Sequence, residues 1–150
     1  MFAFSNHPYR LNAFLVLLIV AGGLLWYYLY TPPRLVAQLD NPFTLQMNQR
    51  ADLADADLHI TWVGVADGRC SQCTATFNAV VTLQLQVAGQ PATEQFLSTP
   101  PFITEYRDTL TFAGYQIQLL DLDPTPHYPH SVVPSWNYRL QLQVTRLTAK

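Results

Sequence analysis

The sequence predicts a mainly β protein: an immunoglobulin-like antiparallel β-sandwich that follows a single N-terminal transmembrane helix. Residues 11–30 form an uncharged apolar stretch, and after it short segments alternate apolar and polar residues, with turn-forming residues between them. Period-two alternation is typical of strands with one buried and one solvated face. We therefore expect a cytoplasmic N-terminus at 1–10, a helix at 11–30, a linker at 31–42 and an extracytoplasmic sandwich at 43–150.

The apolar stretch has the length of a membrane anchor. Twenty helical residues rise about 30 Å, the thickness of the hydrocarbon core of a bilayer. A cleaved signal peptide has a shorter apolar core and small residues at its cleavage site, whereas this stretch ends in bulky aromatics, and Pro32 and Pro33 follow. The aromatic residues expected at the membrane interface are Trp26, Tyr27, Tyr28 and Tyr30.

Two further features bear on how the anchor is used. Gly22 and Gly23 lie inside the stretch and would let a partner helix approach closely, although glycine is also common in membrane helices generally. Arg10 and the α-amine precede the stretch, while Arg34 and then Asp40 follow it. This small charge difference favours a cytoplasmic N-terminus and a single-pass protein of the cell membrane with its C-terminal domain outside the cytoplasm.

The chain is poor in charge. Charged residues make up 12% of it, against about 25% in typical soluble domains, and Lys150 is its only lysine. Binding to nucleic acid requires clustered lysine and arginine, so we do not expect a nucleic-acid partner. A neutral surface suits contact with another protein, because charge is depleted at the centre of interfaces. The expected partners are membrane lipid and other membrane-protein subunits; a generally glutamine-rich composition of the host's proteins is the alternative explanation.

The domain should contain six to eight short strands. Turn residues separate the alternating segments, for example at Ala66–Gly68 and Ala113–Gly114. Alternation is clearest in five segments and weaker in two more, namely 43–47, 58–65, 81–87, 115–119 and 138–144, then 93–97 and 109–112.

The order of residues in the domain resembles an uncharacterised family of small secreted bacterial β-sandwich domains, often lipoproteins. The pattern D-x-R-C, a second cysteine and N-A-x-V carry the resemblance, and it extends over most of residues 43–144. The positions are Phe43–Leu45, Gln49, Leu58–Val65, Asp67, Arg69, Cys70, Cys73, Asn78–Leu83, Tyr115–Leu122, Pro124, Pro126 and Tyr138–Val144. The resemblance implies an extracytoplasmic sandwich whose two cysteines pair, and it implies no activity. This chain departs from the family in its short cysteine loop and in having an apolar helix where relatives have a lipidated cysteine.

Cys70 and Cys73 are the clearest candidates for chemistry. Two intervening residues are compatible with a disulfide that closes the loop, with a redox pair, or with half of a zinc site. A redox pair of the thioredoxin type needs a helix after it, and no helical pattern follows; Thr74 in place of histidine excludes haem attachment through C-x-x-C-H. His127 and His130, in a proline-rich loop, could complete a zinc site if the two loops met at one end of the sandwich, but a surface loop bearing histidines is the simpler interpretation.

Other clusters have simpler explanations. Asp52, Asp55 and Asp57 lack the glycine and the ligand spacing of a calcium loop and are interpreted as a solvated turn. His59 alternates with apolar neighbours and is expected on the outer face of its strand. No serine lies in a nucleophile elbow, and we expect neither an enzyme nor a cofactor.

Three functions are compatible with these features. The first is a non-catalytic accessory or structural subunit of a larger membrane complex, such as a respiratory or photosynthetic one. The second is a membrane-tethered module that binds a metal ion or small ligand, with Cys70, Cys73, His127 and His130 as the candidate site. The third is a protein of thiol–disulfide exchange.

Overall fold

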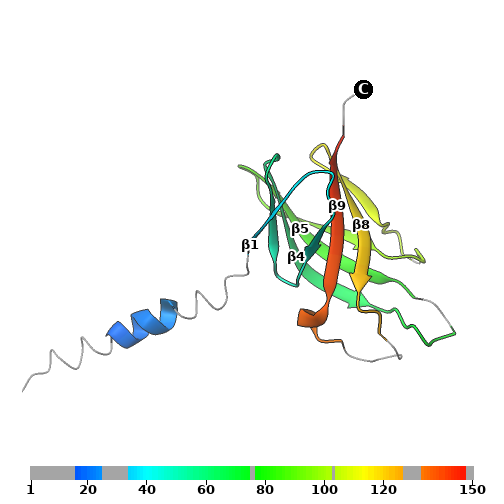
Figure 1. The fold of residues 1–150 in the computed structure, drawn as a ribbon, viewed down its shortest axis with the longest axis horizontal. Helices are drawn as coiled ribbons and strands as arrows, with labels where there is room; N and C mark the ends of the chain where they lie inside the picture. The colour runs from blue at the N-terminus through cyan, green and yellow to red at the C-terminus, as the bar shows by residue number, and fades with distance from the viewer. Residues whose placement is uncertain (1–15, 25–33, 75–76, 103, 127–132, 148–150) are drawn as a thin grey trace, which may run out of the picture. The chain divides into compact units, whose positions relative to one another are not determined.

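The computed structural model describes residues 16–24, 34–74, 77–102, 104–126 and 133–147 (Figure 1). Residues 1–32 and residues 33–150 form separate compact units. In the first unit, residues 16–24 are helical. Within the described residues, no helical segment combines the length and the apolar character needed to traverse a bilayer. The remainder of the expected 11–30 helix, including Trp26, Tyr27, Tyr28 and Tyr30, lies outside the described residues.

The second unit is mainly β and consists of two sheets, as the alternation predicted. One sheet has the strand order β1-β3-β4-β5-β6 and the other β2-β9-β8-β7. The strands are β1 (Arg34–Ala37), β2 (Phe43–Leu45), β3 (Arg50–Leu53), β4 (Leu58–Asp67), β5 (Ala79–Val87), β6 (Thr93–Ser98), β7 (Thr109–Phe112), β8 (Tyr115–Asp123) and β9 (Arg139–Arg146), with the 3-10 turn η1 (Ser135–Asn137) before β9.

The strand order differs from the expected immunoglobulin-like arrangement. In that fold, the first, second, fourth and fifth strands form one sheet and the third, sixth and seventh the other, so the chain changes sheet three times. Here β3 to β6 form an antiparallel meander within one sheet, and β7 to β9 form a second meander in the other. The alternation identifies the buried face of each strand but carries no information about which strands are neighbours. The predicted immunoglobulin-like arrangement of the strands was therefore wrong.

The expected 31–42 linker is in part a strand. Arg34–Ala37 forms β1 and pairs in parallel with β3, which the alternation also missed. In β1 the apolar residues Leu35, Val36 and Ala37 follow one another without alternation, and β3 contains Asp52, which the sequence assigned to a turn. Asp52 accordingly lies in β3, whereas Asp55 and Asp57 lie in the turn that follows.

One hydrophobic core lies between the two sheets and draws on both. Its fully buried members include Trp62 and Leu83 from one sheet and Ile117 and Leu140 from the other. These residues occupy alternate positions on their strands, so the outward positions hold glutamine and threonine. Trp62 is the largest buried side chain, and its indole N–H donates to the carbonyl oxygen of Gly64 at 2.8 Å, beside a register shift in β4.

The turn between β7 and β8 shows how local sequence sets the register. Ala113 and Gly114 both have positive φ, 49° and 81°, as a two-residue type I′ hairpin turn requires. This geometry pairs Phe112 with Tyr115 and brings Ile117 opposite Leu110. The turn predicted at Ala113–Gly114 is confirmed.

Replacing Trp62 with alanine should destabilise the domain by about 3–5 kcal/mol, because it leaves a large cavity between the sheets. Trp136→Ala is the matched control, because the Trp136 side chain is exposed and substitutions of that kind cost about 0.5 kcal/mol or less. Urea unfolding of both variants measures the difference. Equal stability of the two variants would contradict the assignment of Trp62 to the core.

Candidate functional site

Three long loops gather at one end of the second unit, which we call the loop end. Strands β4, β6 and β8 run toward this end, and β5 and β9 start from it. In the described part of the chain, these loops comprise residues 68–74 and 77–78 with the two cysteines, residues 99–102 and 104–108, and residues 124–126 and 133–138 with η1. Asp67 at the end of β4 pairs with Ala79 at the start of β5, while Asp123 pairs with Arg139 in the other sheet.

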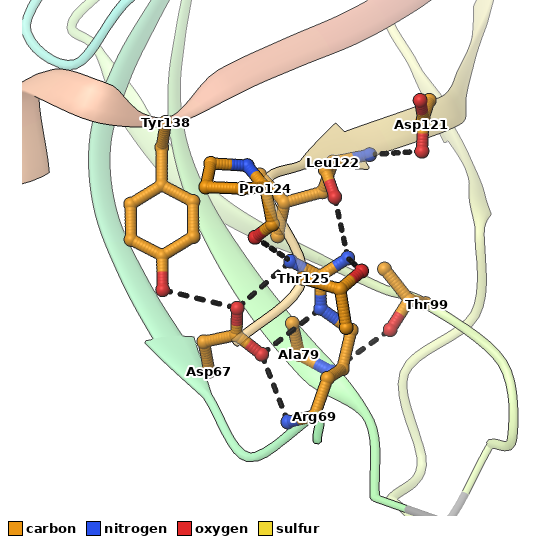
Figure 2. A network of polar contacts seen from close by, with 9 residues as sticks. All are labelled: Asp67, Arg69, Ala79, Thr99, Asp121, Leu122, Pro124, Thr125 and Tyr138. Atoms are coloured by element: carbon orange, nitrogen blue, oxygen red, sulfur yellow. Dashed lines mark hydrogen bonds and ion pairs between the residues drawn. The ribbon is translucent and has the colours of Figure 1, made fainter. Parts of the chain in front are cut away.

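Arg69 is the centre of the loop end (Figure 2). Its side chain is only 12% exposed and forms a bidentate pair with the Asp67 carboxylate, Nε to Oδ1 at 2.9 Å and Nη2 to Oδ2 at 2.8 Å. The same guanidinium donates to the carbonyl oxygens of Leu122 and Pro124 and to the Thr125 hydroxyl. A guanidinium has five N–H donors, so every one of them has a partner within the domain.

These contacts join the two sheets. Asp67 belongs to β4 of one sheet, whereas Leu122 belongs to β8 of the other and Pro124 follows it directly. Tyr138, which precedes β9, donates its hydroxyl hydrogen to Asp67 Oδ2 at 3.0 Å. Arg69, Asp67 and Tyr138 therefore form an electrostatic staple between the sheets, and from here on we call these three residues the Arg69 staple.

The cysteine loop and the proline-rich loop meet at this end. Cys70 and Cys73 are joined in a disulfide, and the backbone N–H of Ser71, inside that disulfide loop, donates to the carbonyl oxygen of Pro126 at 2.9 Å. His127 and His130, which follow Pro126 in the sequence, lie outside the described residues. The condition that the two loops share one end of the sandwich is met, but the thiolates that a zinc site requires are consumed in the disulfide.

A second polar cluster supports the 99–108 loop. Thr99 is buried; its hydroxyl oxygen accepts a hydrogen bond from the backbone N–H of Ala79 at 2.8 Å, and its own backbone N–H donates to the carbonyl oxygen of Ala79 at 2.9 Å. The Asn78 amide donates to the hydroxyl of the fully buried Ser98 at 2.7 Å. Ser98 is thus a hydrogen-bonded structural residue within the sheet. The cluster connects the start of β5 with the end of β6.

A hollow of about 320 Å³ lies beside Arg69, between the 99–108 loop and β8. Asp108 and Asp121 line it, and the Asp121 carboxylate accepts the backbone N–H of Leu122. Arg69 is also in its wall, but its donors are all engaged inside the domain, so the guanidinium has no N–H left for an anion. Within the described part of the chain, no cluster of three or more histidine, cysteine or acidic side chains could hold a metal ion.

The other sequence candidates lie apart from the loop end. His59 is on the outer face of β4, as expected, with its Nδ1 2.6 Å from Asp52 Oδ1. Burial raises the pKa of Asp52, but the hydrogen bonds and charges of Arg50 and His59 outweigh it and leave that pKa below its usual value. Gly22 and Gly23 lie in the helical residues 16–24, where an added Cβ would meet no other atom of the chain within 4 Å.

Sequence reasoning did not identify the Arg69 staple, although the staple uses residues of the D-x-R-C pattern. Asp67 and Arg69 are two residues apart, a spacing that places side chains on the same face of extended chain. That spacing was the available signal for an ion pair. The partners in β8 and before β9 lie more than fifty residues further along the chain and had no local signature.

Comparisons with protein-family models, with curated proteins and with solved structures gave no match to this chain.

Replacing Arg69 with methionine should cost about 3–5 kcal/mol of unfolding free energy, because it leaves the buried Asp67 charge without its partner. Arg139→Met is the control, since that side chain is exposed and binds only backbone carbonyls. Adding Asp67→Asn to Arg69→Met should recover part of the loss by removing the stranded charge. Urea unfolding measures all three variants, and a loss at Arg69 no larger than at Arg139 would contradict the staple.

Stability should also fall at high pH through Tyr138. Burial, together with the charge and the hydrogen bond of Asp67, raises the pKa of Tyr138 to about 12 from the ordinary value of 10.0, against a smaller opposing effect of Arg69. The folded state thus favours the neutral phenol, and this stabilisation is complete below pH 10 and is lost between about pH 10 and pH 12. The difference in urea midpoint between wild type and Tyr138→Phe should shrink over that range. A difference that stays constant would contradict the assignment.

Proposed function

We propose that this chain is a non-catalytic accessory subunit of a membrane-protein assembly, anchored by residues 11–30 and carrying its β domain on the extracytoplasmic side. The observation that carries the proposal is the outer face of the β2-β9-β8-β7 sheet. Apart from Asp121, Asp123 and Arg139 at its loop end, the outward side chains of this sheet are uncharged and polar: Thr44, Thr109, Thr111, Gln116, Gln118, Gln141, Gln143 and Thr145. We call this surface the Gln/Thr face.

The Gln/Thr face is continuous across the sheet. Thr109, Gln118 and Gln143 lie opposite one another on three neighbouring strands, as do Thr111, Gln116 and Thr145. The charged outward residues of this sheet, Asp121, Asp123 and Arg139, lie at its loop end. The outer face of the other sheet holds the charged Arg50 and Asp52, the histidine His59 and, on its edge strand, Glu94. Protein interfaces are depleted of charge at their centre, so the Gln/Thr face is the better candidate for the surface that contacts a partner subunit.

The loop end supports a structural role for the remaining polar residues. The Arg69 staple satisfies its own donors and acceptors, and the cysteines are oxidised to a disulfide. General acid–base catalysis needs a titratable group within reach of a substrate. The titratable side chains of the Arg69 staple are instead hydrogen-bonded to one another and to the two sheets. The resemblance to secreted β-sandwich domains, carried partly by Asp67 and Arg69, agrees with an extracytoplasmic location.

Site-specific photocrosslinking in native membranes tests the proposal. A crosslinking residue at Gln116, on the Gln/Thr face, should capture one defined membrane-protein partner in proportion to the chain. The matched control is Gln84, an outward-facing glutamine on the inner strand β5 of the other sheet, which should not. After gentle solubilisation, the chain should migrate with that partner.

Two outcomes would contradict the proposal. A chain that migrates alone after gentle solubilisation is not a subunit of a stable assembly. Capture from Gln84 rather than from Gln116 would place the partner on the charged sheet and would remove the argument from the Gln/Thr face.

A further inference from the structure

Strand β7 lies at one edge of the β2-β9-β8-β7 sheet and forms its ladder with β8. Phe112 pairs with Tyr115 across the two-residue turn, and the backbone N–H of Leu119 donates to the carbonyl oxygen of Asp108 at 2.6 Å. In an antiparallel pair, alternate residues of a strand direct their N–H and C=O groups toward the same neighbour. The even-numbered residues of β7 therefore form its hydrogen bonds with β8.

The other two residues of β7, Thr109 and Thr111, direct their backbone groups away from β8. Within the part of the chain that the structure describes, no backbone hydrogen bond engages either residue on that side. Their N–H and C=O groups are thus available to a further strand, as in the binding modes in which an extended segment is added to a sheet edge.

The three other sheet edges in the described residues carry features that oppose the addition of a strand. Natural sheets block their edges with charge, proline, short strands or bulges. Arg34 is in β1, Glu94 is in β6, and β2 has only three residues and follows Pro42 directly. At the end of β6, the N–H of Ser98 is also taken by the carbonyl oxygen of Arg107 at 2.8 Å. Strand β7 contains neither charge nor proline, and its register with β8 is unbroken.

The core-facing side chains of β7 are incompletely covered. Leu110 and Phe112 pack against the core but remain partly exposed. Ile117 and Leu119, their neighbours on β8, are 0% and 5% exposed. A strand beside β7 would therefore bury apolar surface in addition to pairing backbone groups.

The sequence of β7 is complementary to itself in one antiparallel register. With Leu110 opposite Leu110 of a second copy, Thr109 of each copy lies opposite Thr111 of the other. Both threonine pairs are then hydrogen-bonded pairs, because these are the residues whose backbone groups point outward. Cross-strand threonine pairs are favourable, and no like charges meet. The nearest charge, Asp108, falls opposite Phe112.

We propose that two copies of this chain associate through β7, antiparallel about a two-fold axis at Leu110, so that their β2-β9-β8-β7 sheets form one continuous sheet. A second copy is the occupant because a two-fold contact requires a self-complementary surface, and this edge is self-complementary in both charge and hydrogen bonding. The inference does not depend on the proposed subunit role. It places the Gln/Thr faces of the two copies next to each other on one side of the joined sheet.

Disulfide crosslinking of the full chain tests the register. Chains with Thr109→Cys and chains with Thr111→Cys, carrying different tags, are expressed in one membrane and oxidised mildly. Opposite residues of a hydrogen-bonded pair have Cα atoms about 5.5 Å apart, which a disulfide can bridge. The mixture should therefore give a dimer that contains both tags.

Two controls accompany the crosslinking. Either variant alone should crosslink much less, because like positions are diagonal neighbours about 7–8 Å apart. Thr44→Cys mixed with Thr111→Cys should not crosslink, because Thr44 is an exposed threonine on the opposite edge of the same sheet.

Charge substitutions test the contact without a new cysteine. Thr109→Lys/Thr111→Lys places lysine opposite lysine in both pairs, whereas Thr109→Lys/Thr111→Glu places lysine opposite glutamate in both. Like charges directly opposite one another destabilise strand pairing. In analytical ultracentrifugation of the detergent-solubilised full chain, wild type and the Lys/Glu variant should sediment as dimers and the Lys/Lys variant as a monomer.

Several results would overturn the proposal. A wild-type chain that sediments as a monomer and gives no crosslink between positions 109 and 111 has no β7 contact. A dimer that persists in the Lys/Lys variant is held together elsewhere in the chain. Loss of the dimer in the Lys/Glu variant as well, or equal crosslinking in the single-variant samples, would contradict the proposed register.

Discussion

The arrangement of the loop end depends on one guanidinium. Burial of apolar side chains is non-directional, so a shared core does not by itself fix the ends of two sheets relative to each other. A directional contact between the sheets is needed for that. Arg69 supplies this direction, with a bidentate bond to Asp67 in one sheet and bonds to the backbone carbonyls of Leu122, within β8 of the other sheet, and of Pro124, directly after β8. A planar guanidinium suits this task because its donors point in fixed directions, which a lysine ammonium cannot reproduce.

The ion pair stabilises the domain because it is well satisfied. Burying a charge is costly unless its partners replace the lost water, and the Asp67 carboxylate receives the guanidinium, the Tyr138 hydroxyl and the backbone N–H of Arg69. The cysteine disulfide closes the loop immediately after Arg69, and Ser71 connects that loop to Pro126.

The sequence predicted the parts of the fold that depend on short-range patterns, namely strand alternation and turn residues. The alternation in β4, β5, β8 and β9 identified their buried faces, and Ala113–Gly114 identified a hairpin turn. Strand β1 was missed because its apolar residues do not alternate, and β3 because Asp52 was assigned to a turn. The immunoglobulin-like arrangement was wrong because strand pairing depends on residues distant in the chain. At the loop end, the cysteine pair and the proline-rich loop were recognised as candidates. The Arg69 staple was not, since its partners at Leu122, Pro124 and Tyr138 have no local pattern in common with it.

Hydrogen exchange of backbone amides in wild type and in Arg69→Met tests most directly whether one guanidinium organises the loop end. The amide of Ser71, bonded to Pro126, and the amide of Gly68, bonded to Asn78, report on the loop end, while the amide of Ala88, bonded to Asp57, reports on the opposite end. We expect Ser71 and Gly68 to lose protection together in the variant at a denaturant concentration where Ala88 keeps its protection. Unchanged protection of Ser71 and Gly68, or an equal loss at Ala88, would contradict the account.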